Sequence, residues 1–371
     1  MGWNVNTDLA LGSFNFDLAP IIIVAFFTVL LVFGTKIGAR VDGAMTVLKI
    51  AIVVFVVIVG FFYVKASNFT PFIPPSQPAA ATTGDGAVSA QMAQPLWQWA
   101  TGMTPSIYGV PGILSGAALV FFAFLGFDVV ATASEETKNP HKNVPLGIGV
   151  GMLLIIVMYM LVAIVTTGMV SYKDLAKQDS PSLATAFELV GADWAAKIIS
   201  FGIVLGLATV IMVLLLGLTR IVFAMSRDGL LPRGLSKTGK YGTPAVLQIV
   251  VGVVVALVAA LFDIGVLSDM VNIGTLSAFT LVAISIPIMR KKRPELPRAF
   301  RMPGNPWVPI LIALANFWLM LNLSVLTWIR FLVWLVIGFA IYFSYGYWHA
   351  RLGKGDLSET LSDETDRAVN G

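Results

Sequence analysis

Cysteine is absent from this 371-residue chain, which excludes disulfide bonds and thiolate metal sites. Histidine is almost absent, since the chain has only His141 and His349. A membrane enzyme would need acids, bases or metal ligands that converge on one site. These two histidines stand apart, one in a connection between apolar runs and one at the end of the last run. The sequence therefore predicts no enzyme, no metal site and no cofactor.

Charged residues are also scarce. They make up 12% of the chain against 57% hydrophobic residues, and the mean hydropathy is +0.86. A soluble globular domain does not have this composition. The apolar runs are long and continuous, whereas the strands of a membrane barrel are short and alternate in polarity. The sequence therefore predicts an all-α polytopic membrane protein.

Windows of about 18 to 24 residues with few charges predict the membrane spans. There are nine such runs, at 18–35, 44–64, 113–134, 146–169, 198–219, 245–262, 270–289, 307–324 and 331–348.

The basic residues fall mainly on one side of these spans. Alternate connections, the first taken as 36–49 so that it includes Lys49, and the C-terminal tail hold 19 of the 24 Lys and Arg residues. The positive-inside rule makes this side cytoplasmic, so the C-terminus is predicted inside the cell and the N-terminus outside. This distribution also explains the net charge of +4 without nucleic acid as a partner. Residues 1–17 are polar and lack a signal-peptide pattern, so an external N-terminus predicts an odd number of upstream helices that this chain lacks.

The run from residue 121 to 145, FFAFLGFDVVATASEETKNPHKNVP, is an irregular membrane span. Gly126 and Asp128 interrupt its aromatic stretch, and Glu135 and Glu136 follow about two turns later. Irregular backbone survives at membrane depth only where protein or a polar cavity surrounds it. The run therefore predicts a broken helix that faces a small solute.

Three segments carry a family resemblance. The run above, RIVFAMSRDGLLP at 220–232 and NIGTLSAFTLVAISI at 272–286 resemble, in order and spacing, the cationic amino acid transporter branch of the amino acid–polyamine–organocation (APC) superfamily. The resemblance implies a LeuT-like inverted-repeat helical bundle, with this chain matching family helices four to twelve. Its implied parts are a remnant of the first repeat (1–64), an external connection (65–112), a second repeat (113–289), two further helices (290–348) and a cytoplasmic tail (349–371).

The external connection has a low-complexity, almost uncharged stretch from 67 to 104. This composition predicts a flexible insertion without chemistry of its own.

The resemblance also implies a substrate site at the broken helix. The carbonyls of Phe122, Ala123 and Leu125 would accept the ammonium of an amino acid, and Gly126 would permit the unwinding. The neighbouring phenylalanines 121, 124 and 127 are alternatively packing residues, and a membrane glycine is commonly a close-packing position. Met212 is implied to limit the depth of the pocket and so to favour small or neutral amino acids, with simple packing as the alternative.

Lys49 stands alone in an apolar run, about five residues into its span. It is either a long side chain that reaches back to the interface or, as the resemblance implies, the proton-coupling group. Tyr159 is a hydroxyl in an apolar run, and the resemblance places it near that lysine. Asp128, Glu135 and Glu136 are expected either to pair with Arg220 or Arg227 in an inner gate, or to be solvated charges at a helix end.

The resemblance, together with the broken helix, implies secondary active amino acid transport across the plasma membrane, as a proton-coupled symport with alternating access around that helix. Its partners would be the amino acid, protons and the lipid bilayer. The alternative is a non-transporting fragment, membrane subunit or nutrient sensor derived from such a transporter.

Overall fold

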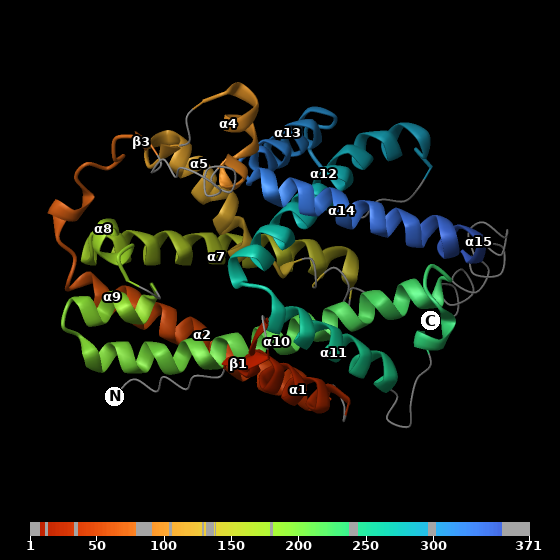
Figure 1. Ribbon diagram of the computed structural model, residues 1–371, viewed down its shortest axis with the longest axis horizontal. Helices are drawn as coiled ribbons and strands as arrows, with labels where there is room; N and C mark the ends of the chain where they lie inside the picture. The colour runs from red at the N-terminus through yellow and green to blue at the C-terminus, as the bar shows by residue number, and fades with distance from the viewer. Residues whose placement is uncertain are drawn as a thin grey trace. The chain divides into compact units, whose positions relative to one another are not determined.

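The structure is a computed structural model, which describes residues 8–11, 14–32, 36–78, 91–103, 106–127, 130, 137, 139–178, 181–236, 244–295 and 302–350. Helices dominate it (Figure 1). The longer ones are α1 (Leu18–Val32), α2 (Lys36–Phe61), α5 (Gly109–Val120), α7 (Pro140–Met169), α10 (Asp193–Arg227), α11 (Ala245–Leu261), α12 (Ile264–Lys292), α13 (Trp307–Leu321) and α14 (Val325–Ile341).

Short elements fill the connections. They are α4 (Leu96–Thr101), α8 (Tyr172–Leu175), α9 (Leu183–Leu189), α15 (Tyr347–His349), the 3₁₀ turns η1 (Ala66–Phe69), η2 (Phe121–Phe124) and η4 (Arg233–Ser236), and the π-turn η5 (Tyr342–Gly346). Two antiparallel ribbons pair β1 (Asp8–Leu11) with β2 (Phe14–Asp17), and β3 (Gln77–Pro78) with β4 (Ser106–Ile107).

Each predicted apolar run overlaps a helix. Four segments are long and apolar enough to cross a membrane, namely Lys142–Met169, Asp193–Arg227, Ile264–Lys292 and Val325–His349. Five shorter apolar helices cover the other runs, at Pro20–Val32, Met45–Phe61, Gly109–Phe124, Ala245–Leu261 and Trp307–Leu321. The helical membrane fold is thus confirmed. The count of nine spans stays a prediction, because the five shorter helices fall below the 18 residues that define a candidate span.

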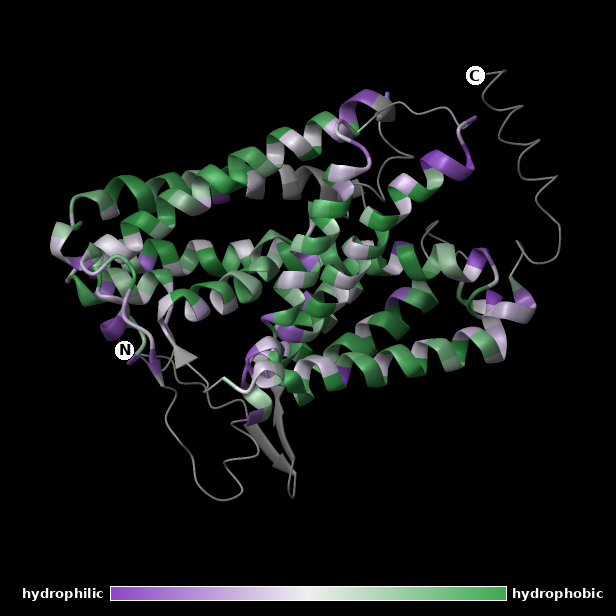
Figure 2. Ribbon diagram, turned by 90° about the horizontal axis from the view of Figure 1, so that it is seen from above, coloured by the Kyte–Doolittle hydropathy of each residue, from purple (hydrophilic) through white to green (hydrophobic). Residues whose placement is uncertain are grey.

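The helix surfaces suit a lipid environment. In the span at Lys142–Met169, only 6% of the most apolar window is buried in the protein. Figure 2 shows hydrophobic residues along the helix bodies and hydrophilic residues gathered at several helix ends. So much exposed apolar surface would be unfavourable in water but is what the hydrocarbon core of a bilayer requires.

The described chain forms two compact units. One contains Met1–Gly38, Ile211–Ile264 and Ile329–Gly371, and the other contains Ala39–Val210 and Gly265–Trp328. In the first unit α1 lies along α11 (Figure 1). Gly252 of α11 faces the side chain of Thr28, whose hydroxyl donates a 2.7 Å bond to the carbonyl of Val24. Because Gly252 has no side chain, the two helices can approach closely here.

The second unit packs α2 against α7, α9 and the first part of α10. Val56, Phe187 and Ile199 are each 1% exposed at its centre. The run Ala192, Ala195 and Ala196 at the start of α10 is also buried, and these small side chains allow the helices to approach one another.

Part of the external connection is ordered, contrary to the prediction of a flexible insertion. Residues 91–103 include α4 and pair with the turn between α13 and α14 through an antiparallel bridge of Pro95 with Ser324. The indole of Trp97 donates a 2.9 Å bond to the amide oxygen of Asn322 and stacks on Trp318. Composition alone missed this docking because the partners of Trp97 lie on α13 and just after it, far along the chain.

Candidate functional site

The third apolar run is a broken helix, as predicted. The α-helix α5 ends at Val120 and continues as the 3₁₀ turn η2. Leu125 then adopts extended backbone with a ψ of 145°, and Gly126 has a φ of +123°. Only glycine adopts this φ without strain. The sequence therefore breaks the helix at Gly126 for a backbone reason, which favours the predicted unwinding over the alternative of a close-packing glycine.

The carbonyls at the break have specific partners. The amide of Leu125 donates a 3.2 Å bond to the carbonyl of Phe122, which is a 3₁₀-type bond that is weaker in geometry than an α-helical one. The hydroxyl of Tyr159, on α7, donates a 2.8 Å bond to the carbonyl of Ala123. A side chain thus replaces the bond that a continuous helix would supply to this carbonyl.

The phenylalanines around the break pack against neighbouring helices. The ring of Phe124 meets the ring of Tyr159 edge-on, with centroids 5.1 Å apart. Phe121 and Phe127 both contact Phe279 of α12, at 6.2 and 5.3 Å between centroids. These contacts support the packing interpretation for the three phenylalanines. They also hold the irregular backbone between α7 and α12.

Asn272 of α12 was not singled out from the sequence. It is fully buried, and its amide nitrogen donates a 3.2 Å bond to the carbonyl of Leu119, just before the break. Its amide oxygen is buried with no hydrogen-bond donor among the described residues. Because a buried unpaired acceptor is costly, this oxygen marks a place where a further donor group would be favourable.

Lys49 lies on α2 where that helix meets α10. Its side chain is partly buried, and a Cβ added to Gly206 of α10 would lie 4.0 Å from the Cγ of Lys49. One turn further along α2, Ile52 covers Gly202. Gly202 and Gly206 form a small-xxx-small pair of the kind that brings membrane helices together. The stem of Lys49 therefore faces Gly206 of α10, with room for a methyl group between them.

Of the other predicted residues, the structure describes Met212 and Arg220 but not the carboxylates. Met212 is 7% exposed in the apolar core of the first unit, with Val24 and Leu247, so its described contacts are those of a packing residue. Arg220, on α10, is partly buried. The carboxylates Asp128 and Glu135, with Glu136, lie outside the described residues. Within the described part of the chain, no group of three or more His, Cys, Asp or Glu could hold a metal ion.

Comparison with known proteins gives the family. The amino acid permease family matches residues 14–347. The branched-chain amino acid permease BcaP of Bacillus subtilis (strain 168) is 41% identical over 345 residues, which cover 92% of this chain and 67% of that protein. The chain belongs to the amino acid permease family. The resemblance to APC-superfamily permeases is thereby confirmed, and the protein is a multi-pass membrane protein of a transporter family.

Two further relatives show the range of this family. The methylthioribose transporter of Bacillus subtilis (strain 168) is 38% identical over 340 residues, which cover 91% of this chain and 66% of that protein. The vacuolar cationic amino acid transporter 4 of Arabidopsis thaliana is 34% identical over 280 residues, which cover 75% of this chain and 42% of that protein. This permease chain therefore spans about two thirds of the length of its two Bacillus relatives.

Proposed function

We propose that this protein carries amino acids across the cell membrane, with the broken helix at residues 121–126 as the substrate site. The observation that supports the site is the backbone at the break, where Leu125 is extended and Gly126 has a φ of +123° that only glycine adopts without strain. At membrane depth such backbone is tolerated only where protein buries it or where it lines a polar cavity. The unwound carbonyls are acceptors of the kind that an ammonium group requires.

The proposed substrate class is neutral, apolar amino acids. A relative at 41% identity is a branched-chain amino acid permease, and a second protein with that name, from Lactococcus lactis, is 30% identical over 332 residues. The phenylalanines at 121, 124 and 127 give the break apolar surroundings. A cationic side chain would need carboxylate partners there.

Proton coupling through Lys49 is part of the proposal. Lys49 is a single basic residue within an apolar helix segment, and its stem faces α10 at Gly206. A lysine in a partly dehydrated environment can change its protonation when its surroundings change. Movement of the protein between outward-open and inward-open states would then link proton transfer to substrate movement. The proposed orientation places the C-terminus in the cytoplasm.

Uptake by the purified chain in liposomes tests this function. Proteoliposomes with an inward proton gradient are given radiolabelled L-leucine, and L-arginine in parallel. We expect leucine to accumulate, and arginine to accumulate less. Tight leucine binding without any uptake would instead support the non-transporting alternative, a sensor or membrane subunit.

A further inference from the structure

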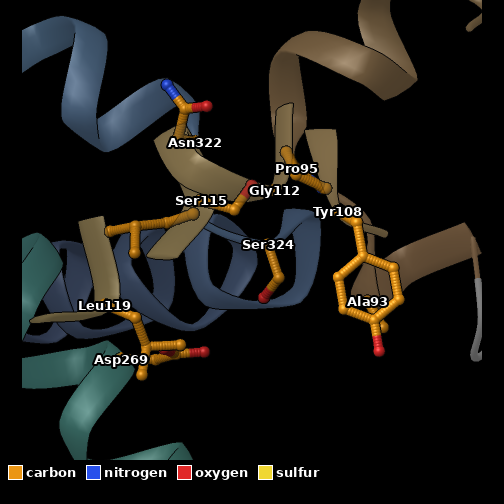
Figure 3. A pocket seen from close by; sticks show the side chains of 10 residues that line it. Ala93, Pro95, Tyr108, Gly112, Ser115, Leu119, Asp269, Asn322 and Ser324 are labelled. Carbon is orange, nitrogen blue, oxygen red and sulfur yellow. The ribbon is translucent and has the colours of Figure 1, made fainter. Parts of the chain in front are cut away.

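A cavity of about 430 Å³ lies beside the beginning of the broken helix. Its walls come from α5, from the first turns of α12, from the turn between α13 and α14, and from the ordered part of the external connection (Figure 3). All of these segments belong to the second unit. The volume is within the range of small-molecule sites, roughly 300 to 1,000 Å³. By the distribution of basic residues, the start of α12 is predicted on the external face.

Among the described residues that line it, the cavity has one carboxylate. Of these ten residues, Asp269 of α12 is the only Asp or Glu, and none is Lys, Arg or His. Figure 3 shows the side chains of Asp269 and Ser324 directed into the same space. Tyr108 and Ser115 add hydroxyl groups to the walls. The lining is therefore chemically matched to a small molecule with a positive group and other hydrogen-bond donors or acceptors.

A chain of hydroxyl groups orients the carboxylate. Thr327, which is fully buried, donates a 3.0 Å bond to one oxygen of Asp269. The hydroxyls of Ser324 and Thr327 are 2.7 Å apart. Each hydroxyl has one hydrogen, so Thr327, which gives its own to Asp269, must accept from Ser324. These two described hydroxyls thus both donate toward Asp269, an arrangement that suits an ionised carboxylate.

The outer wall of the cavity is built by specific contacts. The external connection is tied to the α13–α14 turn by two backbone bonds, Leu96 nitrogen to Leu323 oxygen at 3.0 Å and Val325 nitrogen to Gln94 oxygen at 3.1 Å. The amide of Asn322 points away from the cavity in Figure 3, consistent with its bond to Trp97. These contacts fix the segment that contributes Pro95 to the lining.

One face of α12 connects the cavity with the break. Asp269, Asn272, Leu276 and Phe279 follow one another at helical spacing. Asp269 lines the cavity, Asn272 bonds Leu119, which also lines it, and Phe279 packs on the two phenylalanines that flank the break. The oxygen of Asn272, which has no donor in the described part of the chain, places a further acceptor along this face.

We propose that this cavity is an outer binding site for an amino acid, which is held by its ammonium group at Asp269. An organic ammonium is favoured over a metal ion because 430 Å³ is far more than one dehydrated ion fills, and because Leu119 and Leu323 offer apolar walls for a side chain. The site would take the substrate before it reaches the break. This role rests on the proposed transport function, but the binding itself does not.

The test is calorimetric titration of the purified chain in lipid nanodiscs. The probes are leucinamide, which has an ammonium but no carboxylate, 4-methylpentanoate, which has a carboxylate but no ammonium, and sodium chloride. The test variant is Asp269→Asn, which keeps the shape of the side chain and its ability to accept from Thr327. The matched control is Asp263→Asn, an exposed carboxylate six residues earlier. Both variants are also combined with Gly126→Ala, which disrupts the proposed site at the break, so that binding measured in this background reports on the cavity.

We expect Asp269→Asn to weaken leucinamide binding at least tenfold in the Gly126→Ala background, with Asp263→Asn unchanged and 4-methylpentanoate unaffected. Asp269→Glu, which keeps the charge, should recover part of the affinity, whereas a merely misfolded variant would not regain it. The proposal is overturned if Asp269→Asn binds leucinamide as the control does, or if sodium competes for the site at equal concentration. Failure of the transport proposal is separate, since it would appear as absent leucine uptake whatever the calorimetry shows.

Discussion

The hydroxyl of Tyr159 lies 2.8 Å from the carbonyl oxygen of Ala123 and donates to it. This carbonyl is one of those proposed to accept the substrate ammonium, so Tyr159 and the substrate would compete for the same acceptor. The ring of Tyr159 is held independently by its edge-on contact with Phe124. The hydroxyl can therefore be removed without moving the ring.

Tyr159→Phe should raise the apparent affinity for leucine, because the competing donor is gone. A net hydrogen bond of about 0.5 to 1.5 kcal/mol corresponds to roughly a 2- to 10-fold lower Kd. The measurement is equilibrium binding of radiolabelled leucine, with Tyr63→Phe at the end of α2 as the matched control. A lower affinity in Tyr159→Phe would mean that the hydroxyl supports the site instead of competing for it.

Gly126→Ala should damage the break through the backbone alone. A Cβ at Gly126 would meet no atom within 4 Å, but the φ of +123° is one that alanine adopts only with strain. The expected cost is about 1 to 3 kcal/mol, together with loss of leucine uptake. Thermal unfolding in detergent and uptake in liposomes measure the two effects.

Gly116→Ala is the matched control for that variant. Gly116 also has open space around it but lies inside the helix α5, where alanine is favoured over glycine by about 0.5 to 1 kcal/mol. It should therefore be neutral or slightly stabilising, with uptake retained. Equal behaviour of the two variants would show that the unusual backbone at Gly126 is not required.

The sequence anticipated the features that depend on local chemistry. A glycine within an aromatic membrane run predicts a break, and Gly126 is where the helix breaks. Lys49 is a single charge in an apolar run, so the sequence alone is enough to single it out. These predictions need only the residue and its immediate neighbours, because helix propensity and the cost of charge in lipid act locally.

Features that depend on distant partners were missed. The acceptor of Tyr159 is 36 residues away, and Asn272 meets Leu119 across 153 residues. Asp269 lies near the start of its helix. In the sequence it therefore cannot be told from an ordinary solvated charge at a helix end. It gains its place in a cavity only through Thr327, 58 residues further along the chain. No spacing rule in one sequence reveals such pairs.

The contact between α2 and α10 gives a prediction about stability. A Cβ at Gly202 would overlap both branches of the Ile52 side chain, whereas one at Gly206 would be at an ordinary contact distance of 4.0 Å from Lys49. Gly202→Ala should therefore destabilise the protein by about 1 to 3 kcal/mol through overpacking, and Gly206→Ala should be close to neutral. Thermal unfolding of the two variants compares them directly, and equal midpoints would contradict the close packing of Ile52 on α10.

Lys49→Met separates substrate binding from proton coupling. Methionine keeps much of the length of the side chain that faces Gly206 but cannot titrate. A lysine charge within a membrane helix is costly, up to roughly 2.5 to 3.5 kcal/mol at the helix centre, so the variant should fold at least as well as the parent. Leucine should still bind and exchange, while accumulation driven by an inward proton gradient should be lost.

Lys49→Arg is the control, because it keeps the charge without releasing a proton and should also fail to accumulate leucine. If accumulation in Lys49→Met keeps its dependence on the gradient, Lys49 is an interface anchor and the coupling group lies elsewhere.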